Sequence, residues 1–331
     1  MNLIPTLGPF HMLHPRYNGV TVLELARSAR PTVLYLASYS TADLASKVWR
    51  ESNEVSFFHV LPWAERENLP VQALDEGSQL KAEAESFREA LAMYPKGQEI
   101  LARLGELEAL LGAVLTQPKS PEDWGREEVV QPLRQYTDGY AALLGEGPAT
   151  GFRRQRMEAV AARLAGLGPQ AQSAVILVDL LDYPVLLELL PSTPALLTPP
   201  SAHVPSEAER ERSVLDRAWR LEESDDWAQL LGQLREIEAP EALYCAAQIY
   251  LAAGQPADAF VLLDQLIHKD FHQPEYLPGY ALSRYGQMAD LEGQREKALR
   301  AYAAVLALDW APQEAREIAL AGRKAPFRLE P

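Results

Sequence analysis

A histidine and two aspartates each follow a short apolar run, and side chains at such positions can form a ligand site where β-strands end. His11 follows an apolar pair at residues 3–4, and Asp179 and Asp182 follow the β-branched run at 175–178. In open α/β sheets the carboxyl ends of the strands meet at one edge, and ligands bind there. An imidazole and two carboxylates can hold a divalent metal ion or take a proton. We therefore predict His11, Asp179 and Asp182 as metal ligands, with His11 and Asp182 as catalytic residues.

Each of these three residues also has a structural interpretation that the sequence leaves open. A histidine in a loop can simply hydrogen-bond a backbone carbonyl, and His14 stands three residues after His11. Asp179 and Asp182 precede a helix that starts near Pro184. Acids at that position cap the helix and interact with its dipole.

Three arginines fall within one helical turn and could bind an anionic substrate. They are Arg153, Arg154 and Arg156, and guanidinium groups bind anions through charge-assisted hydrogen bonds. We predict Arg153 and Arg154 as substrate-binding residues; the alternative is a solvated helix face. The sequence has no phosphate loop ending in Gly-Lys-Ser/Thr, no Gly-x-Gly-x-x-Gly after a strand, no Gly-x-Ser-x-Gly and no His-Glu-x-x-His. The common nucleotide-binding enzymes and serine hydrolases are therefore poor matches.

The elements that position these residues alternate between helix and strand over the first 75 residues, as in a layered α/β unit. Strand signals then vanish, and we predict an all-α insert at about 78–150 that could act as a lid. Strand character resumes at 173–180, after a helix at 152–167. The other predicted segments are helices 20–30, 41–50, 78–94, 98–115 and 121–144, and strands 32–36 and 68–74.

A proline-rich segment at 191–206 precedes an all-helical region, and we predict it to be a semi-rigid linker. Within 207–331 a spacing of small and aromatic residues recurs after 39 residues. This recurrence indicates helical hairpins with a glycine at each turn. We expect a less regular hairpin over 211–238 and a solvating end helix at 312–323. The first copy of the spacing is Ala247, Tyr250, Gly254 and Ala259, and the second is Gly286, Ala289, Gly293 and Ala298.

The repeat positions resemble the tetratricopeptide pattern, and residues 1–190 resemble the TraB/ChaN/erythromycin-esterase-like superfamily, which includes the Tiki metalloproteases. That family opens with strand-Gly-x-x-His, matched by the Gly-Pro-Phe-His sequence at 8–11. It continues with a strand after Arg-Pro, matched at 30–36, and a strand with Pro-Val before an acid, matched at 69–75. After a helical insert and a helix with Arg and Met, its last strand ends in Gly-x-x-His before a proline. Residues 179–184 occupy that last place.

The resemblance implies a site in which two histidines and a glutamate hold a divalent metal, with hydrolysis of a peptide or ester bond in some members. In this chain His11 matches the first histidine, but Ala37 stands at the glutamate position. Asp182 replaces the second histidine, and Asp179 replaces the glycine of its motif. These departures indicate a degenerate metal site, so we expect either no cofactor or a divalent metal ion held weakly by His11 and Asp182.

The composition predicts an acidic chain of about two domains without a nucleic-acid or membrane partner. The 331 residues include 46 acidic and 31 basic side chains, which give a net charge of -15. Such a charge repels nucleic acids and anionic membranes. No run approaches the roughly 20 apolar residues of a membrane span, and no signal peptide is recognisable. The single cysteine, Cys245, excludes an internal disulfide and fits a reducing cytoplasm.

We therefore predict an α/β domain at 1–190 that contains the helical insert, the linker at 191–206, and an all-α tetratricopeptide-like helical-hairpin domain at 207–331. The favoured function is a protein- or peptide-binding scaffold, in which the TraB-like domain is inactive and the repeats contact the partner. The net charge favours basic peptides, and the repeats could instead form a homo-oligomer contact. The alternative function is a metal-dependent hydrolase of peptide or ester bonds with an altered metal site.

Overall fold

The chain folds into two compact units, Met1–Arg210 and Glu211–Pro331, in a computed structural model. The first unit is α/β and the second is helical, as the sequence predicts at this coarse level. The boundary falls inside a helix, a few residues after the predicted end of the linker. The structure describes residues 1–51, 54–77, 83, 86–87, 89–167, 173–190, 195–196 and 203–329.

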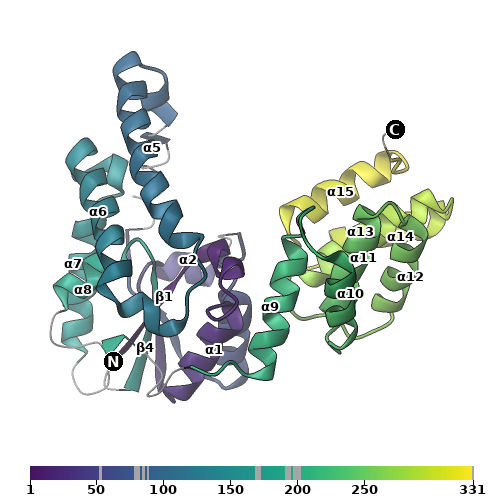
Figure 1. Cartoon of the computed structure of the whole chain (residues 1–331), viewed down its shortest axis with the longest axis horizontal. Coiled ribbons are helices and arrows are strands. Elements are labelled where there is room, and N and C mark those ends of the chain that lie inside the picture. Colours follow the sequence, from purple (N-terminus) through teal and green to yellow (C-terminus); the bar gives the residue numbers. More distant parts are fainter. Residues whose placement is uncertain are drawn as a thin grey trace. The chain divides into compact units, whose positions relative to one another are not determined.

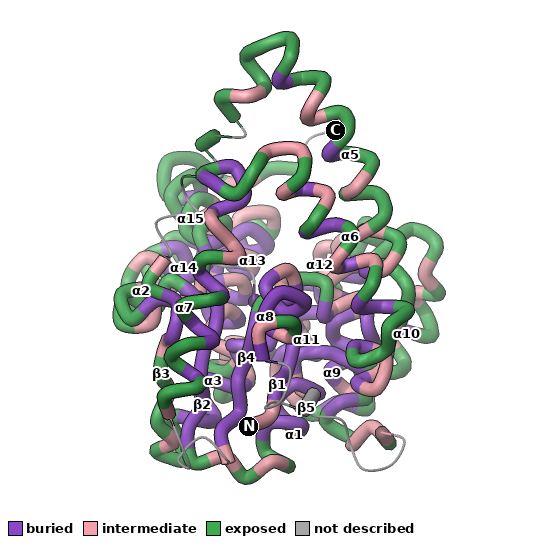
Figure 2. The backbone as a smooth tube through the Cα atoms, turned by 90° about the vertical axis from the view of Figure 1, so that its left-hand side faces the viewer, coloured by how far each residue is buried: buried purple, intermediate pink, exposed green. Residues whose placement is uncertain are grey.

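Unit 1 is built on a parallel sheet with the strand order β3-β2-β4-β1-β5. Strands β1, β2 and β4 are buried along nearly their whole length (Figure 2), because their Val, Ile and Leu side chains meet helices on both faces. The register of β1 with β4 runs from Asn2 opposite Val175 to Thr6 opposite Asp179, so the carboxyl ends of these strands meet at one edge. The strands are β1 (Asn2–Thr6), β2 (Val33–Leu36), β3 (Val71–Ala73), β4 (Ala174–Asp179) and β5 (Ala195–Leu196).

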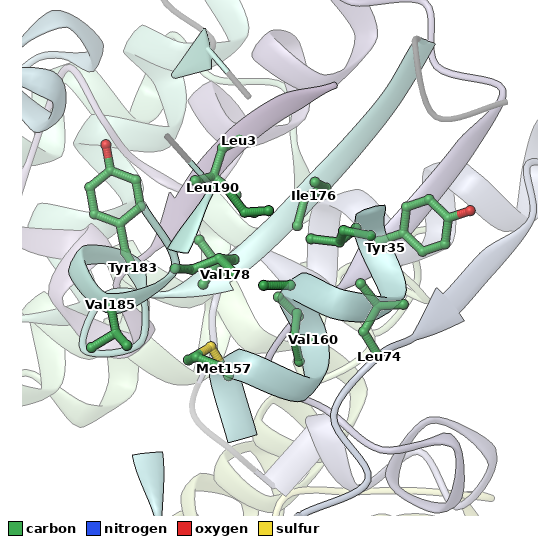
Figure 3. Packing of buried hydrophobic residues seen from close by; sticks show 14 of the residues in the cluster. Leu3, Tyr35, Leu74, Met157, Val160, Ile176, Val178, Tyr183, Val185 and Leu190 are labelled. Carbon is green, nitrogen blue, oxygen red and sulfur yellow. The ribbon is translucent and has the colours of Figure 1, made fainter. Parts of the chain in front are cut away.

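Helices lie on both sides of this sheet (Figure 1). On one face, Met157 and Val160 of α7 (Arg153–Gly166) and Val185 of α8 (Tyr183–Leu189) join Ile176 and Val178 of β4 in one apolar cluster (Figure 3). On the other side α1 (Gly19–Ser28) packs against α3 (Phe57–Arg66). The sheet thereby lies between two helical layers, and side chains from several strands can meet at its carboxyl edge.

The loop between β1 and α1 carries His11 in a short 3-10 helix, Gly8–Leu13. The loop ends at Asn18, whose Oδ1 accepts hydrogen bonds from the backbone N–H groups of Val20 and Thr21. These two bonds satisfy N–H groups that the first turn of α1 leaves without a helical partner. The side chain of Asn18 is fully buried, so the loop is anchored at its carboxyl end.

The helical insert contains α5 (Pro95–Leu115) and α6 (Glu127–Leu144), which pack through Leu104, Tyr136 and Tyr140. Two of the three helices predicted in this region are therefore present, with α6 starting six residues later than predicted because Pro121–Gly125 forms a 3-10 turn. Of the first predicted helix, 78–94, the structure describes residues 83, 86–87 and 89–94, and residues 83, 86–87 and 89–92 are helical.

Unit 2 consists of successive antiparallel helices, and two of the connections between them turn at a glycine. Gly254 and Gly293 have φ angles of +72° and +70°, a conformation that glycine adopts without strain. In each turn the residue after the glycine, Gln255 or Gln294, donates its backbone N–H to the carbonyl oxygen of the residue five positions earlier. The first helix of each hairpin therefore ends in the same way. The helices are α9 (Glu207–Trp219), which begins in unit 1, α10 (Trp227–Arg235), α11 (Pro240–Ala252), α12 (Pro256–Leu266), α13 (Leu277–Leu291), α14 (Arg295–Ala307) and α15 (Gln313–Lys324).

Side-chain sizes at equivalent positions of the two hairpins compensate each other. In the first hairpin Ala247 and Leu263 are buried in the same apolar cluster. In the second hairpin the corresponding pair is Gly286 and Tyr302, and a Cβ added to the glycine would lie 2.4 Å from the tyrosine ring. The smaller residue on one helix thus makes room for the larger one on the other.

Three local predictions differ from the structure. The helix predicted at 41–50 is divided into α2 (Thr41–Ala45) and a 3-10 turn, because Lys47 between them has φ of 55°, which no helix accommodates. Helix α3 was not anticipated, since Pro62 inside it is a residue that usually ends helices. The predicted linker also contributes β5, which pairs with β1.

None of the helices in the described ranges combines the length and the apolar character that a membrane crossing requires.

Candidate functional site

His11 lies buried at the carboxyl edge of the sheet, and its own loop occupies both ring nitrogens. Nε2 accepts a hydrogen bond from the backbone N–H of Leu7 at 3.0 Å, and Nδ1 lies 2.8 Å from the backbone oxygen of Tyr17. Because Nε2 accepts, Nδ1 carries the proton and donates to that oxygen. Burial lowers the pKa of His11 to about 3, so the ring is neutral. This arrangement matches the structural interpretation that the sequence left open.

Glu54 is the acidic neighbour of His11, and no pattern in the sequence indicates it. Its Oε1 lies 3.6 Å from Nε2 of His11, and its Oε2 accepts from the backbone N–H of Gly8 at 2.7 Å. Burial raises the pKa of Glu54 to about 7, against the lowering effect of hydrogen bonds from Ser56 and Gly8; Asp179 raises it further. The edge of the sheet thus holds a buried imidazole beside a carboxyl whose pKa lies near neutrality.

Asp179 and Asp182, the two predicted aspartates, serve separate local structures. Oδ1 of Asp179 accepts from the backbone N–H of Leu181 at 2.9 Å and forms the turn after β4. Asp182 directly precedes α8, but its carboxylate makes no capping hydrogen bond there. Its Oδ2 instead accepts from the hydroxyl of Ser38 at 2.7 Å, and Asp182 is almost completely buried. The helix-cap interpretation is therefore wrong for the side chain of Asp182.

The three arginines of α7 bind different partners because Arg153 and Arg156 lie on one face of the helix and Arg154 lies on another. Arg153 and Arg156, one turn apart, both bind Asp182, at 3.2 Å and 3.0 Å. Arg156 also binds Asp75, which follows β3, at 2.7 Å. Burial alone would lower the pKa of Arg156, but the two carboxylates outweigh it and raise that pKa. Arg154 points elsewhere and pairs with exposed Glu188 on α8.

These residues do not fit a metal ion. Both nitrogens of His11 are hydrogen-bonded to backbone atoms, and the carboxylate of Asp182 is neutralised by two guanidinium groups. Across the part of the chain that the structure describes, no group of three or more His, Cys, Asp or Glu side chains is arranged to hold one. A catalytic zinc site typically has three protein ligands, so the arrangement favours a structural role for this edge. The metal-ligand and catalytic assignments to His11, Asp179 and Asp182 stay predictions.

Unit 2 contains a hollow of about 630 Å³ between α10, α11 and α12. Most of its lining residues are apolar, although about half of the exposed lining surface is polar. The apolar residues include Leu234 of α10, four side chains of α11 and Leu262 of α12. The α11 side chains are Ala242, Leu243, Ala246 and Tyr250. Of these, Leu243, Ala246 and Tyr250 stand about one helical turn apart and so share one face of the helix.

The polar part of this lining carries more positive than negative charge. Arg235 and Lys269 are both exposed, and Glu238 is the single acid among the lining residues. The net charge of -15 led us to expect a preference for basic peptides, but the local charge at the hollow has the other sign. The net charge of the whole chain therefore does not describe the charge at this hollow.

The sequence contains a signal for two further residues at the sheet edge, Arg156 and Asp75, but none for Glu54. Arg156 stands three residues after Arg153 and therefore on the same helix face, so periodicity favours it over Arg154. Asp75 follows a strand, like Asp179. Glu54 has neither signal, because it lies in a loop far from any motif and only the folded chain brings it to His11.

No protein-family model, curated protein or solved structure matches the chain.

Proposed function

We propose that the chain is a protein- or peptide-binding scaffold. In this proposal its tetratricopeptide-like helical hairpins at 207–331 contact the partner, and its TraB-like α/β domain lacks a working metal centre. The observation that carries the proposal is the hollow between α10, α11 and α12. Its volume of about 630 Å³ lies in the range of roughly 300–1,000 Å³ that is usual for ligand pockets.

The lining of the hollow supports a peptide as its occupant. Leu243, Tyr250 and Leu262 are partly exposed there, and burying apolar side chains of a partner against them is favourable. Exposed Arg235 and Lys269 add charge that attracts acidic groups of the partner. The proposed partner is therefore a peptide segment with apolar side chains flanked by acids.

The state of the sheet edge in unit 1 supports the non-catalytic half of the proposal. His11, Asp75 and Asp182 are each at most 2% exposed. Their polar atoms bind the backbone of the same loop or the arginines of α7. Such a network stabilises the sheet edge without needing a substrate.

Selection of displayed random peptides on the full chain tests the scaffold. We expect selected peptides to combine apolar and acidic residues and to bind Leu243→Ser at least about tenfold more weakly than wild type. The matched control is Leu299→Ser, which changes an exposed leucine of α14 that does not line the hollow. Equal binding to the two variants, or no selected peptides, would contradict the proposal.

The second candidate is the metal-dependent hydrolase, and one observation favours it. Glu54 supplies a carboxyl with a pKa of about 7 beside His11, and shifted pKa values are common in active sites. Elemental mass spectrometry of untagged protein separates the two candidates. Near-stoichiometric Mn, Fe, Co or Zn that disappears in His11→Ala would favour the hydrolase over the scaffold.

A further inference from the structure

Two buried polar atoms on neighbouring helices of unit 2 have no hydrogen-bond partner among the described residues. They are Oε1 of Gln248 on α11 and Nε of Arg284 on α13. Both side chains also reach the hydroxyl of Tyr244. Nε2 of Gln248 donates to it at 3.2 Å, and the guanidinium of Arg284 lies beside it. An unused acceptor and an unused donor therefore flank one tyrosine hydroxyl, which is costly unless a ligand uses them.

The charge of Arg284 is not neutralised, in contrast to other arginines of this unit. Arg212 binds Glu241 at 2.8 Å, and Arg295 binds Asp290 at 2.8 Å. Nη1 of Arg284 donates at 2.7 Å to the neutral amide of Gln287. Within the ranges that the structure describes, no carboxylate forms an ion pair with Arg284, although the chain carries 46 acidic residues. A partly buried guanidinium in this condition attracts an anion.

Aromatic side chains lie next to these polar groups. The ring of Trp219 lies 4.8 Å from that of Tyr244 and 5.3 Å from that of Tyr280. Trp219 and Tyr280 are partly exposed, so they offer an apolar surface with polar tips, which suits a peptide. Gln248 stands one turn after Tyr244 on α11, and Arg284 stands one turn after Tyr280 on α13. The polar groups and the aromatic rings thus occupy successive turns of adjacent helices.

We propose that Arg284 and Gln248 form a binding site for a carboxylate on an acidic peptide. The guanidinium of Arg284 binds the carboxylate, Oε1 of Gln248 accepts an N–H from the peptide, and the aromatic rings contact its apolar atoms. One uncompensated cation matches a single carboxylate better than a doubly charged phosphate. This inference rests on the proposed scaffold function and adds a second contact, because the hollow uses Leu243, Ala246 and Tyr250 on another face of α11.

Fluorescence anisotropy with the full chain tests the site. The probe is a labelled peptide of alternating Glu and Ala with blocked ends, and the neutral comparison replaces every Glu by Gln. We expect the Glu peptide to bind wild type at least about tenfold more tightly than the Gln peptide, the effect of one charge-assisted hydrogen bond. Arg284→Gln should weaken binding of the Glu peptide by about tenfold. Arg300→Gln, which removes an exposed arginine of α14, is the matched control and should leave the affinity unchanged.

Two further peptides identify the source of the anion. If the Gln peptide with a free carboxyl terminus binds as tightly as the Glu peptide, and Arg284→Gln weakens it, the carboxylate is terminal and the site stands. If a phosphoserine peptide binds far more tightly than either, the carboxylate assignment is overturned. Equal losses in Arg284→Gln and Arg300→Gln, or no binding of the Glu peptide up to about 1 mM, would also overturn it.

Stability separates a binding role from a structural one. Because Arg284 has an unpartnered buried donor, Arg284→Gln should unfold at the same or a higher denaturant concentration than wild type. A clear loss of stability in this variant would mean that Arg284 holds the helices together, contrary to the proposal. Leu243→Ser keeps the polar site intact, so it should still bind the Glu peptide even if the hollow binds nothing.

Discussion

Tyr302 packs against two glycines, and Gly286→Ala is therefore expected to destabilise unit 2. A Cβ at Gly286 would lie 2.4 Å from Cε1 of Tyr302, and a Cβ at Gly322 would lie 2.3 Å from Cζ of the same ring. Carbon atoms in contact need roughly 3.5 Å, so the ring must move by about 1 Å to admit a methyl group. The hydroxyl of Tyr302 donates to Asp290 at 2.9 Å, and Gly322 of α15 lies close to the ring, so such a movement disturbs both.

The magnitude follows from two opposing effects. Overpacking costs about 1–3 kcal/mol, and we take about 3 kcal/mol because the ring is held by its hydroxyl and by α15. Alanine gains about 1 kcal/mol over glycine in the interior of a helix. The expected net loss is about 2 kcal/mol in the free energy of unfolding of unit 2. Gly232→Ala on α10 is the control: a Cβ there meets no atom within 4 Å, so it should stabilise by about 1 kcal/mol.

The first hairpin indicates a second substitution that should restore the stability lost in Gly286→Ala. Its equivalent pair is Ala247 and Leu263, both buried, so Gly286→Ala combined with Tyr302→Leu recreates a combination that the fold already accommodates. In the Tyr302→Leu background, Gly286→Ala should no longer destabilise. Because the chain has two units, peptide-resolved hydrogen exchange measures the effect in α13 and α14 directly. Equal protection of these helices in Gly286→Ala and Gly232→Ala, or no rescue by Tyr302→Leu, would refute this expectation.

Further predictions concern unit 1. The pKa of Glu54 is raised from 4.5 to about 7, so its contribution to stability is complete below pH 4.5 and is lost as pH rises through 7. In urea unfolding, Glu54→Gln should therefore gain roughly 3 kcal/mol relative to wild type between these pH values; an unchanged difference would contradict the shift. Because the pKa of His11 is lowered from 6.5 to about 3, its contribution is present above pH 6.5 and lost as pH falls through 3, so His11→Gln should lose acid sensitivity in that window. Arg156→Met should cost about 3–5 kcal/mol because it leaves two aspartates buried without their shared cation, while Arg154→Met should cost less than about 1 kcal/mol; similar thermal shifts for the two would argue against this network. Asn18→Ala should cost about 1–2 kcal/mol through loss of the α1 cap, measured by thermal unfolding against Ser46→Ala, which changes an exposed serine whose hydroxyl donates to the backbone oxygen of Ala42 at the end of α2 and accepts no N–H of a first helical turn.

Local patterns were enough to predict most of the elements. Strands 32–36 and 173–180 are apolar runs whose burial on both faces needs no knowledge of their partners, and β2 and β4 form there. The hairpin turns at Gly254 and Gly293 could be predicted because the same spacing occurs twice. Helix α3 could not, because the burial of its aromatic face against α1 outweighs the cost of Pro62. Tertiary contacts decided the structure where local preference pointed elsewhere.

The candidate site was predictable in position but not in its pairings. Residues at strand ends gather at one sheet edge because of the parallel topology, and His11, Asp179 and Asp182 are all found there. Which of them bind each other depends on side-chain direction and on residues from other elements. Arg156 takes up the charge of Asp182, and Glu54 approaches His11 from a loop. Metal-ligand spacing in the sequence indicates the acids and the imidazole but not the cations that neutralise the acids.

The net charge of the chain favours a basic partner for unit 2, whereas the local charge favours an acidic one. This difference has a physical reason. A net charge of -15 describes the long-range field, which salt screens over about 10 Å. Binding depends on groups that stay uncompensated at contact distance, and acids elsewhere on the surface do not compensate a partly buried guanidinium. Arg212 lies in the same unit and binds two carboxylates, while Arg284 binds a neutral amide. At the proposed site around Arg284, an acidic peptide therefore binds against a long-range repulsion that added salt should weaken. Binding of the Glu peptide should accordingly tighten, or at least not weaken, as salt rises from low to physiological concentration, whereas purely long-range attraction of a basic peptide would fade.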